Sequence, residues 1–210
     1  MTTTITRTKV ILPHRRADLL TRQRLLDLLY DLLDYQLIVV AAPAGYGKTS
    51  LLIDFAHKSE LPVCWLSIDP YDRDPLRFLS HFIASIAHRF SAFGSRSQAV
   101  IDSASQADLK LDSLVTIVVN EIFDTIQEHF LFFLDDYHLV HDVKEIEYFI
   151  NRCIQEVGEN FHLILSSRSL LTLPDMPLLV ARTKVGGLSF EELAFRSQEI
   201  QALALQNYRV

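Results

Sequence analysis

The sequence has few of the residues that mark several common protein classes. Its 210 residues include two cysteines, Cys64 and Cys153, and neither lies in a CxxC or Cys/His spacing. This scarcity excludes a disulfide framework and a cysteine-based metal site, and it is typical of reduced cytoplasmic proteins. No apolar run is as long as a membrane helix, and the start, MTTTITRTKVILPHRR, lacks the apolar core of a signal peptide. We therefore expect a cytoplasmic chain that does not contact a membrane.

Basic residues are also scarce. There are 20 Lys and Arg against 26 Asp and Glu, which gives a formal net charge of -6. This balance argues against a chain whose main surface neutralises nucleic-acid phosphates. The hydrophobic share of 49% against 22% charged residues is that of an ordinary globular domain. The composition therefore predicts one folded domain with a sizeable core.

Apolar segments alternate between strand and helix patterns along the chain. Strands that are apolar throughout and alternate with helices predict an α/β fold, with a mostly parallel sheet covered on both faces. The stretch 91–106 is rich in Ser, Ala and Gln, and we expect it to be the least ordered part. The predicted strands are 37–42, 61–68, 130–135, 161–166 and a fifth within 178–186. The predicted helices are 19–33, 48–57, 75–90, 111–128 and 144–157, and a further helical element begins after 191.

The clearest motif follows the first predicted strand. The segment APAGYGKT (42–49) matches the phosphate-binding pattern G-x-x-x-x-G-K-[ST] except at its first position, which is Ala42. Such a loop opens a helix, so that its backbone N–H groups surround an anion at the positive end of the helix dipole. Phosphate and nucleotide contacts are therefore expected from Ala44, Gly45, Tyr46, Gly47, Lys48, Thr49 and Ser50. The alternative is a plain strand-to-helix turn with a surface lysine.

Two strand ends supply the charges that such a loop requires. Asp135 ends the third predicted strand, where it would hold Mg²⁺ together with the Thr49 hydroxyl. Asp136 could polarise the attacking water, or it could simply cap a turn. The fourth strand ends at Arg168, which could meet the γ-phosphate or remain a solvated surface charge. Lys48, Asp136 and Arg168 are thus the candidate catalytic residues. For the neighbouring Tyr137 and His138, packing or hydrogen bonding is the expected role.

Taken together, these segments resemble the nucleotide-binding domain of the STAND class of P-loop NTPases, and most closely the MalT-like, LuxR-type transcriptional regulators. In that family an alanine or serine before PAGYGKT is usual, so Ala42 fits the pattern. The resemblance rests mainly on LPHRRADLLTRQRLLDLL (12–29), VVAAPAGYGKTSLL (39–52), VCWLSIDPYDRDPLRFLSHFI (63–83) and FLDDYHLVHD (133–142), with weaker support from LILSSRS (163–169) and LSFEELAFRSQEI (188–200).

The resemblance implies a three-layer P-loop sandwich with five strands in the order 5-1-4-3-2. It also implies a lead-in with an adenine-side element (1–35), an NTPase core (36–188) and the start of a truncated helical subdomain (189–210). Leu20 and Arg22 would lie beside the adenine or phosphates, and Arg168 would sense the γ-phosphate. The implied ligands are ATP or ADP with Mg²⁺. The resemblance also implies that the full-length protein associates with further copies of itself in its ATP state. DNA would be bound only through a C-terminal domain that this sequence does not include.

Three functions fit the motif. The first is a regulatory switch in which ATP stabilises an oligomerising state and slow hydrolysis resets it. The second is a small P-loop kinase or other stand-alone ATPase. A kinase requires a basic lid, yet residues 169–180 contain no basic residue, and only Arg182 and Lys184 follow. The third is a motor or loader acting on nucleic acid, which the acidic balance does not favour.

Overall fold

The computed structural model describes residues 4–103, 110–171 and 173–208. Five strands form one sheet in the order β2-β3-β4-β1-β5, and every neighbouring pair is parallel. This confirms the expected α/β class and the expected strand order. The strands are β1 (Leu37–Ala41), β2 (Val63–Ser67), β3 (Phe130–Asp135), β4 (Phe161–Ser167) and β5 (Val185–Leu188).

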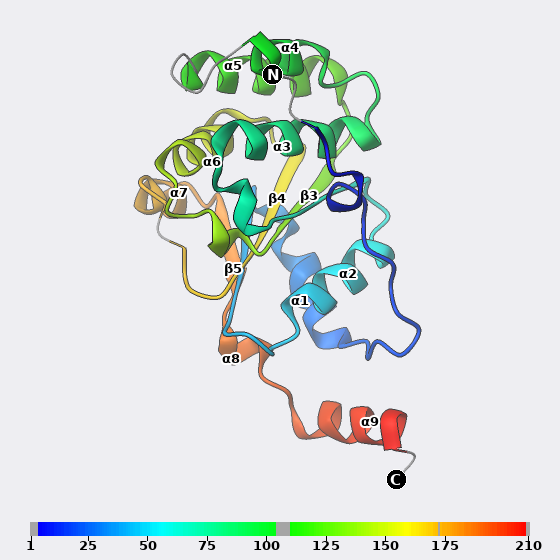
Figure 1. Cartoon of the computed structure of the whole chain (residues 1–210). Helices are drawn as coiled ribbons and strands as arrows, with labels where there is room; N and C mark the ends of the chain where they lie inside the picture. Colours follow the sequence, from blue (N-terminus) through cyan, green and yellow to red (C-terminus); the bar gives the residue numbers. More distant parts are fainter. Residues whose placement is uncertain (1–3, 104–109, 172, 209–210) are drawn as a thin grey trace.

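Helices cover both faces of the sheet (Figure 1). The α-helices are α1 (Gln23–Asp31), α2 (Lys48–Lys58), α3 (Pro75–Arg89), α4 (Ser95–Ser103), α5 (Leu111–Thr125), α6 (Lys144–Glu156), α7 (Met176–Ala181), α8 (Phe190–Leu193) and α9 (Ser197–Tyr208). Helices α1 and α2 pack on one face, and α3 to α7 contribute to the apolar cluster on the other. Helix α9 lies at the end of the molecule beyond α8 (Figure 1). None of the helices in the described ranges is long and apolar enough to cross a membrane.

Strand β3 shows why these strands are apolar throughout. Phe130, Phe132 and Leu134 face the cluster formed with α3, α5 and α6, while Leu131 and Phe133 face the one formed with α2. Phe132 meets Phe82 of α3 edge to face, with the ring centroids 4.7 Å apart. A strand buried on both faces cannot alternate apolar and polar residues, because each polar side chain would be removed from water. Such a strand can therefore carry a charged side chain only at its end.

The segment 91–106 is more ordered than its composition suggests, so the expectation of little structure there was wrong for residues 95–103. These residues form α4, and Ile101 packs in the core. The first turn of α4 is capped from a distance by the buried Glu121 carboxylate on α5. Glu121 accepts hydrogen bonds from the backbone N–H groups of Arg96 and Ser97, both at 2.9 Å. A cap supplied from another helix leaves no local sequence signal. Residues 104–106 lie outside the described part of the chain.

Two element boundaries also differ from expectation. The first helix begins at Gln23 rather than at residue 19, because Arg22 has non-helical backbone angles and the Arg15 guanidinium bonds to the Leu19 carbonyl and the Thr21 hydroxyl. The fifth strand begins at Val185 and continues past 186, because Pro177 starts the short helix α7 in the first part of the predicted range. Neither shift moves the P-loop or Asp135.

The N-terminal segment is tied to the α3 side of the sheet by a buried ion pair. The Lys9 ammonium contacts the Asp72 carboxylate, which is fully buried and also faces His81 of α3. Burial raises the pKa of Asp72, but hydrogen bonds from His81 and Lys9 outweigh this and lower it to about 2. The segment around Lys9 is therefore part of the folded unit.

Both cysteines lie in the core, and neither forms a disulfide. Burial raises the pKa of each thiol well above its usual value, so both are protonated at neutral pH. This agrees with a structural role for Cys64 and Cys153.

The pairing of β5 with β1 requires glycine at position 187. A Cβ added there would lie 2.4 Å from the Val39 carbonyl oxygen, a backbone atom that cannot rotate away. We therefore expect Gly187→Ala to lower the free energy of unfolding by about 1–3 kcal/mol, as measured by urea denaturation. In the control Gly158→Ala, the new methyl would meet only the end of the Asn160 side chain, at 3.0 Å, and we expect a smaller loss. Equal losses in the two variants would contradict the proposed contact.

Candidate functional site

The predicted phosphate loop lies at the carboxyl edge of the sheet, between β1 and α2. Gly45 and Gly47 have φ angles of 90° and 75°, which are left-handed conformations that favour glycine, and a Cβ at either position would meet no atom within 4 Å. These glycines are therefore required by the path of the loop and leave open space on its outer side. Gly47 also caps α2, which begins at Lys48. The backbone thus has the shape of an anion-binding loop at a helix N-terminus.

Lys48 is buried beneath this loop. Its ammonium donates hydrogen bonds to the carbonyls of Ala42, at 2.7 Å, and Pro43, at 3.1 Å. Burial lowers the pKa of Lys48, the nearby Asp136 carboxylate opposes this shift, and the Arg168 guanidinium adds to it. Asp136 and Arg168 are therefore near enough to act electrostatically on Lys48, although the three residues come from separate segments.

Asp135 is held by two hydroxyl groups. Its Oδ1 accepts hydrogen bonds from Thr49 Oγ1, at 3.1 Å, and from Ser166 Oγ, at 2.5 Å. Ser166 Oγ in turn accepts the Asp136 backbone N–H at 2.8 Å. Asp135 and Thr49, the two predicted metal ligands, are thus in direct contact. Sequence reasoning missed Ser166, whose only signal was a polar residue at the end of an apolar strand.

The surroundings of Asp135 make its ionised form less stable than that of a solvent-exposed aspartate. Burial raises the pKa of Asp135, the Ser166 hydrogen bond opposes this shift, and the neighbouring Asp136 charge adds to it. A buried carboxylate beside a second carboxylate is stabilised when a cation is bound. A hard cation such as Mg²⁺ prefers oxygen ligands, and carboxylate and hydroxyl oxygens are the donors present here. The residues therefore fit the expected metal.

The two carboxylates differ in exposure. Asp136 is in the left-handed conformation, with φ of 61°, and its side chain is 43% exposed, whereas Asp135 is 5% exposed. Asp136 can thus meet solvent water while Asp135 remains covered. Arg168, which directly follows β4, is exposed and borders a cavity of about 240 Å³ together with Ala42, Pro43 and Phe190. Asp136 and Arg168 both lie at the carboxyl edge of the sheet, as the P-loop does.

Leu20 and Arg22 border a second cavity beside the loop, of about 180 Å³. Gly45, Gly47 and Ser50 line it from the loop side, and Phe195 and Leu203 line it from the C-terminal segment. The Arg22 guanidinium stacks over the Phe195 ring, 4.2 Å from its centroid, and Nη2 donates to Glu199 Oε2 at 3.0 Å. Arg22 Nε and Nη1 are buried and bond to no group in the described ranges. Arg22 therefore lies at this cavity but is also bound to the C-terminal segment.

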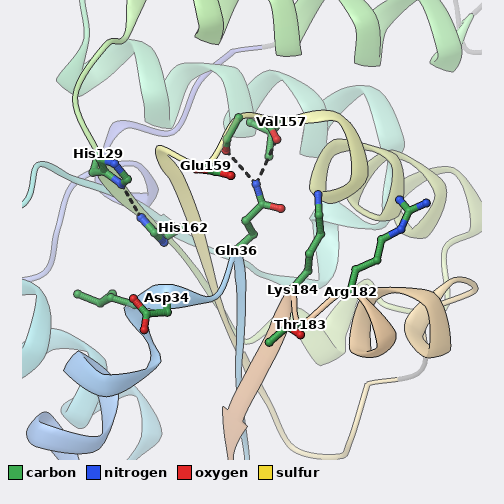
Figure 2. Close-up of a pocket in the computed structure, with 11 residues that line it drawn as sticks. Asp34, Gln36, His129, Val157, Glu159, His162, Arg182, Thr183 and Lys184 are labelled. Atoms are coloured by element: carbon green, nitrogen blue, oxygen red, sulfur yellow. Dashed lines mark hydrogen bonds between the residues drawn. The ribbon is translucent and has the colours of Figure 1, made fainter.

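A larger cavity, of about 610 Å³, lies at the opposite edge of the sheet (Figure 2). Gln36, His162 and Lys184 line it, beside the amino ends of β1, β4 and β5. Its polar groups mainly bond to one another: His129 meets His162 at 3.0 Å, and Gln36 donates to the carbonyls of Val157 and Gly158 (Figure 2). None of the predicted site residues lines it. We therefore place the candidate site at the smaller cavities beside the P-loop.

Sequence comparison relates nearly the whole chain to one group of proteins. HTH-type transcriptional regulators MalT are 32% identical to it over 192 residues in Vibrio cholerae, and 34% identical over 195 residues in Serratia proteamaculans. Each match covers 91% of the chain. The chain is homologous to a segment of the MalT regulators. The chain spans about a fifth (20%) of the length of these relatives. No family model matches the chain.

Solved structures show the same fold at low sequence identity. A Walker-type ATPase of Pyrococcus abyssi superposes on the chain with a TM-score of 0.56 and 12% identity, covering 94% of this chain and 60% of the ATPase. The Aeropyrum pernix ORC1 protein, solved in complex with DNA, gives a TM-score of 0.51 and 17% identity, covering 92% and 49%. The chain therefore shares the α/β fold of these two proteins.

The raised pKa of Asp135 leads to a test of its role. A carboxyl group whose pKa is higher in the folded state favours folding when it is protonated, and that contribution is lost as pH rises above the ordinary aspartate value of about 4. Asp135→Asn should therefore raise the melting temperature of the ligand-free protein at pH 7, and this gain should shrink as the pH falls toward 4. Adding Mg²⁺ with nucleotide should stabilise the variant less than the wild type. A lower melting temperature at pH 7 without ligand would contradict the assignment.

Proposed function

We propose that this chain is the ATP- and Mg²⁺-binding switch module of a signal-responsive cytoplasmic transcriptional regulator. The observation that carries the proposal is the contact of Thr49 and Ser166 with the buried Asp135, directly beside a glycine loop that opens α2. Such a loop with a neighbouring carboxylate is the arrangement by which P-loop proteins hold the phosphates and metal of a nucleotide. The homology to MalT regulators supports the regulatory role.

Each predicted residue has a place in this proposal. The loop N–H groups and Lys48 would hold the phosphates, and Thr49 and Asp135 would hold Mg²⁺, which would neutralise phosphate charge. Asp136, exposed beside them, would orient the attacking water, and Arg168 would meet the γ-phosphate. The adenine would occupy the cavity between Leu20 and Phe195, whose volume of about 180 Å³ suits one flat ring system. Arg22 remains a predicted contact at the wall of this cavity.

The switch itself requires a difference between nucleotide states. A ligand shifts a conformational equilibrium only when it binds the two conformations with different affinity, so the groups that meet the γ-phosphate must supply the signal. In our proposal ATP favours an oligomerising state of the full-length regulator, and slow hydrolysis returns it to the resting state. DNA would be bound through a further domain of that regulator.

The kinase alternative is less well supported. Its lid would need basic residues near the γ-phosphate, and Arg182 and Lys184 are the first basic residues after the segment 169–180, which contains none. Both line the cavity at the amino edge of the sheet, opposite the P-loop (Figure 2). We therefore favour a regulatory ATPase over a phosphotransferase with a small-molecule acceptor. Rapid ATP turnover that depends on such an acceptor would reverse this preference.

Lys48 provides the first test of the proposal. We expect Lys48→Ala to weaken ATP binding at least tenfold in calorimetry, because a buried cation facing the phosphates would be lost. The matched control is Lys144→Ala, which removes an exposed lysine at the start of α6 and should leave the affinity unchanged. Unchanged ATP affinity in Lys48→Ala would refute the phosphate site.

Asp136 tests the division of roles between the two carboxylates. If Asp136 orients water, Asp136→Ala should retain ATP affinity within about threefold while single-turnover hydrolysis falls about a hundredfold. Asp135→Ala should reduce both, because the metal contact is lost. Equal loss of binding and hydrolysis in Asp136→Ala would reassign that residue to the metal or to structure.

A further inference from the structure

The cavity of about 610 Å³ at the amino edge of the sheet is lined by a residue with an unbonded buried acceptor. Gln36 is 8% exposed, and its Nε2 donates to the carbonyls of Val157 and Gly158, at 3.2 and 3.0 Å. These two bonds fix the orientation of the amide, with Oε1 on the side of Lys184 (Figure 2). Oε1 is closed to solvent and bonds to no group that the structure describes. Buried polar atoms are nearly always bonded, so this oxygen needs an explanation.

The neighbouring histidines do not supply a donor for this oxygen. His162 Nδ1 donates to the Tyr35 carbonyl at 3.1 Å, since a carbonyl can only accept. Burial lowers the pKa of His162, so its ring is neutral at neutral pH and Nε2 is an acceptor. That nitrogen receives the N–H of His129 Nδ1 at 3.0 Å. Both ring nitrogens of His162 are therefore already used, and Gln36 Oε1 is left for another group.

Two basic side chains reach the same cavity from the turn between α7 and β5. Arg182 is exposed, and its guanidinium forms no hydrogen bond or ion pair with the described residues. The Lys184 ammonium has only two long contacts, at 3.5 and 3.4 Å, to the carbonyls of Ile154 and Gln155. Burial lowers the pKa of Lys184, the Arg182 charge lowers it further, and the Glu159 carboxylate opposes the shift. An anion between the two cations would relieve their repulsion.

The turn that carries these cations has an unusual residue at its centre. Thr183 has a φ of 54°, a left-handed conformation that is rare for a β-branched residue. Its N–H bonds to the Val180 carbonyl and the Lys184 N–H bonds to the Leu179 carbonyl, both at 2.9 Å, so the turn ends α7. Glycine would form this turn with less strain. Threonine instead adds a hydroxyl group to the cavity wall, between the two cations in sequence.

We propose that this cavity binds a small hydroxylated anion of the sugar-phosphate class. Its anionic group would lie between Arg182 and Lys184, and one of its hydroxyls would donate to Gln36 Oε1. The two long contacts hold the Lys184 ammonium weakly, so the anion can draw it aside and open a path to the covered oxygen. A volume of about 610 Å³ is within the range of small-molecule sites.

The other wall of the cavity suits the hydroxyl groups of such a ligand. Asp34 and Glu159 line it on the opposite side of Gln36 from Arg182 and Lys184 (Figure 2). Carboxylates only accept hydrogen bonds, so they complement hydroxyls and repel a second anionic group. The cavity therefore offers donors at one end and acceptors at the other. It lies at the edge of the sheet opposite the P-loop, so the inference does not depend on the proposed function.

The test titrates the isotope-labelled chain with glucose 6-phosphate, glucose and inorganic phosphate, and follows the backbone amides by NMR. Glucose 6-phosphate should bind at least about tenfold more tightly than either of the other two, because only it combines the anion with the hydroxyls. The amides of residues 182–184 should shift during this titration. The amides of the P-loop, residues 45–49, should not.

Two variants separate the two contacts. Arg182→Ala should weaken the binding of both glucose 6-phosphate and inorganic phosphate about tenfold, because a charge-assisted bond to the anion is lost. Gln36→Met has a side chain of similar length without the acceptor. It should weaken glucose 6-phosphate about fivefold and leave inorganic phosphate within about twofold of wild type. The matched control is Arg7→Ala, which removes an exposed arginine outside the cavity and should change neither affinity.

The inference is overturned if glucose 6-phosphate does not bind, or if its amide shifts are confined to the P-loop. Equal affinity for glucose 6-phosphate and inorganic phosphate also overturns it, because the hydroxyls would then contribute nothing. Unchanged affinity in Arg182→Ala would place the ligand elsewhere. Arg182 is exposed, so this variant remains informative if Gln36→Met does not fold. None of these outcomes bears on nucleotide binding, which the Lys48 variant tests separately.

Discussion

One buried carboxylate sets the geometry of the carboxyl edge of the sheet. Asp135 ends β3, and the hydroxyls of Thr49 and Ser166 bond to the same oxygen atom. Three elements that are remote in sequence are thereby held together at one point: the first turn of α2, the end of β3 and the end of β4. Most of the other strand residues are apolar, and apolar packing alone tolerates small displacements that a hydrogen bond does not. The relative position of the P-loop and the neighbouring strand ends therefore depends on this carboxylate.

The sheet and the phosphate loop were predictable because their causes are local. Strand β3 is a run of six residues whose apolar character follows from burial on both faces, and Asp135 is its last residue. The loop is marked by Gly45 and Gly47, whose left-handed angles disfavour other residues. The strand order came from the family resemblance, since no feature of a single strand specifies its neighbours.

The features that sequence reasoning missed have causes that are distant in the chain. Helix α4 depends on the Glu121 side chain, which lies 24 to 25 residues beyond the N–H groups that it caps. Ser166 gains its role only when β4 is placed beside β3. His138 was expected to pack or to hydrogen-bond, and only the folded structure shows that its two ring nitrogens are buried and bond to no described residue. In each case the side chain type was visible, but its partner was not.

The cavity of about 180 Å³ beside the P-loop is lined by residues from all three predicted segments: the lead-in, the NTPase core and the C-terminal segment. Leu20 belongs to the lead-in, Gly45 to the core and Phe195 to the C-terminal segment, where Glu199 also binds Arg22. Linkage between binding and docking is reciprocal: a molecule that binds more tightly when α9 is docked strengthens that docking by the same factor. For any ligand that occupies this cavity, the docking of α9 and the binding of the ligand would therefore be coupled.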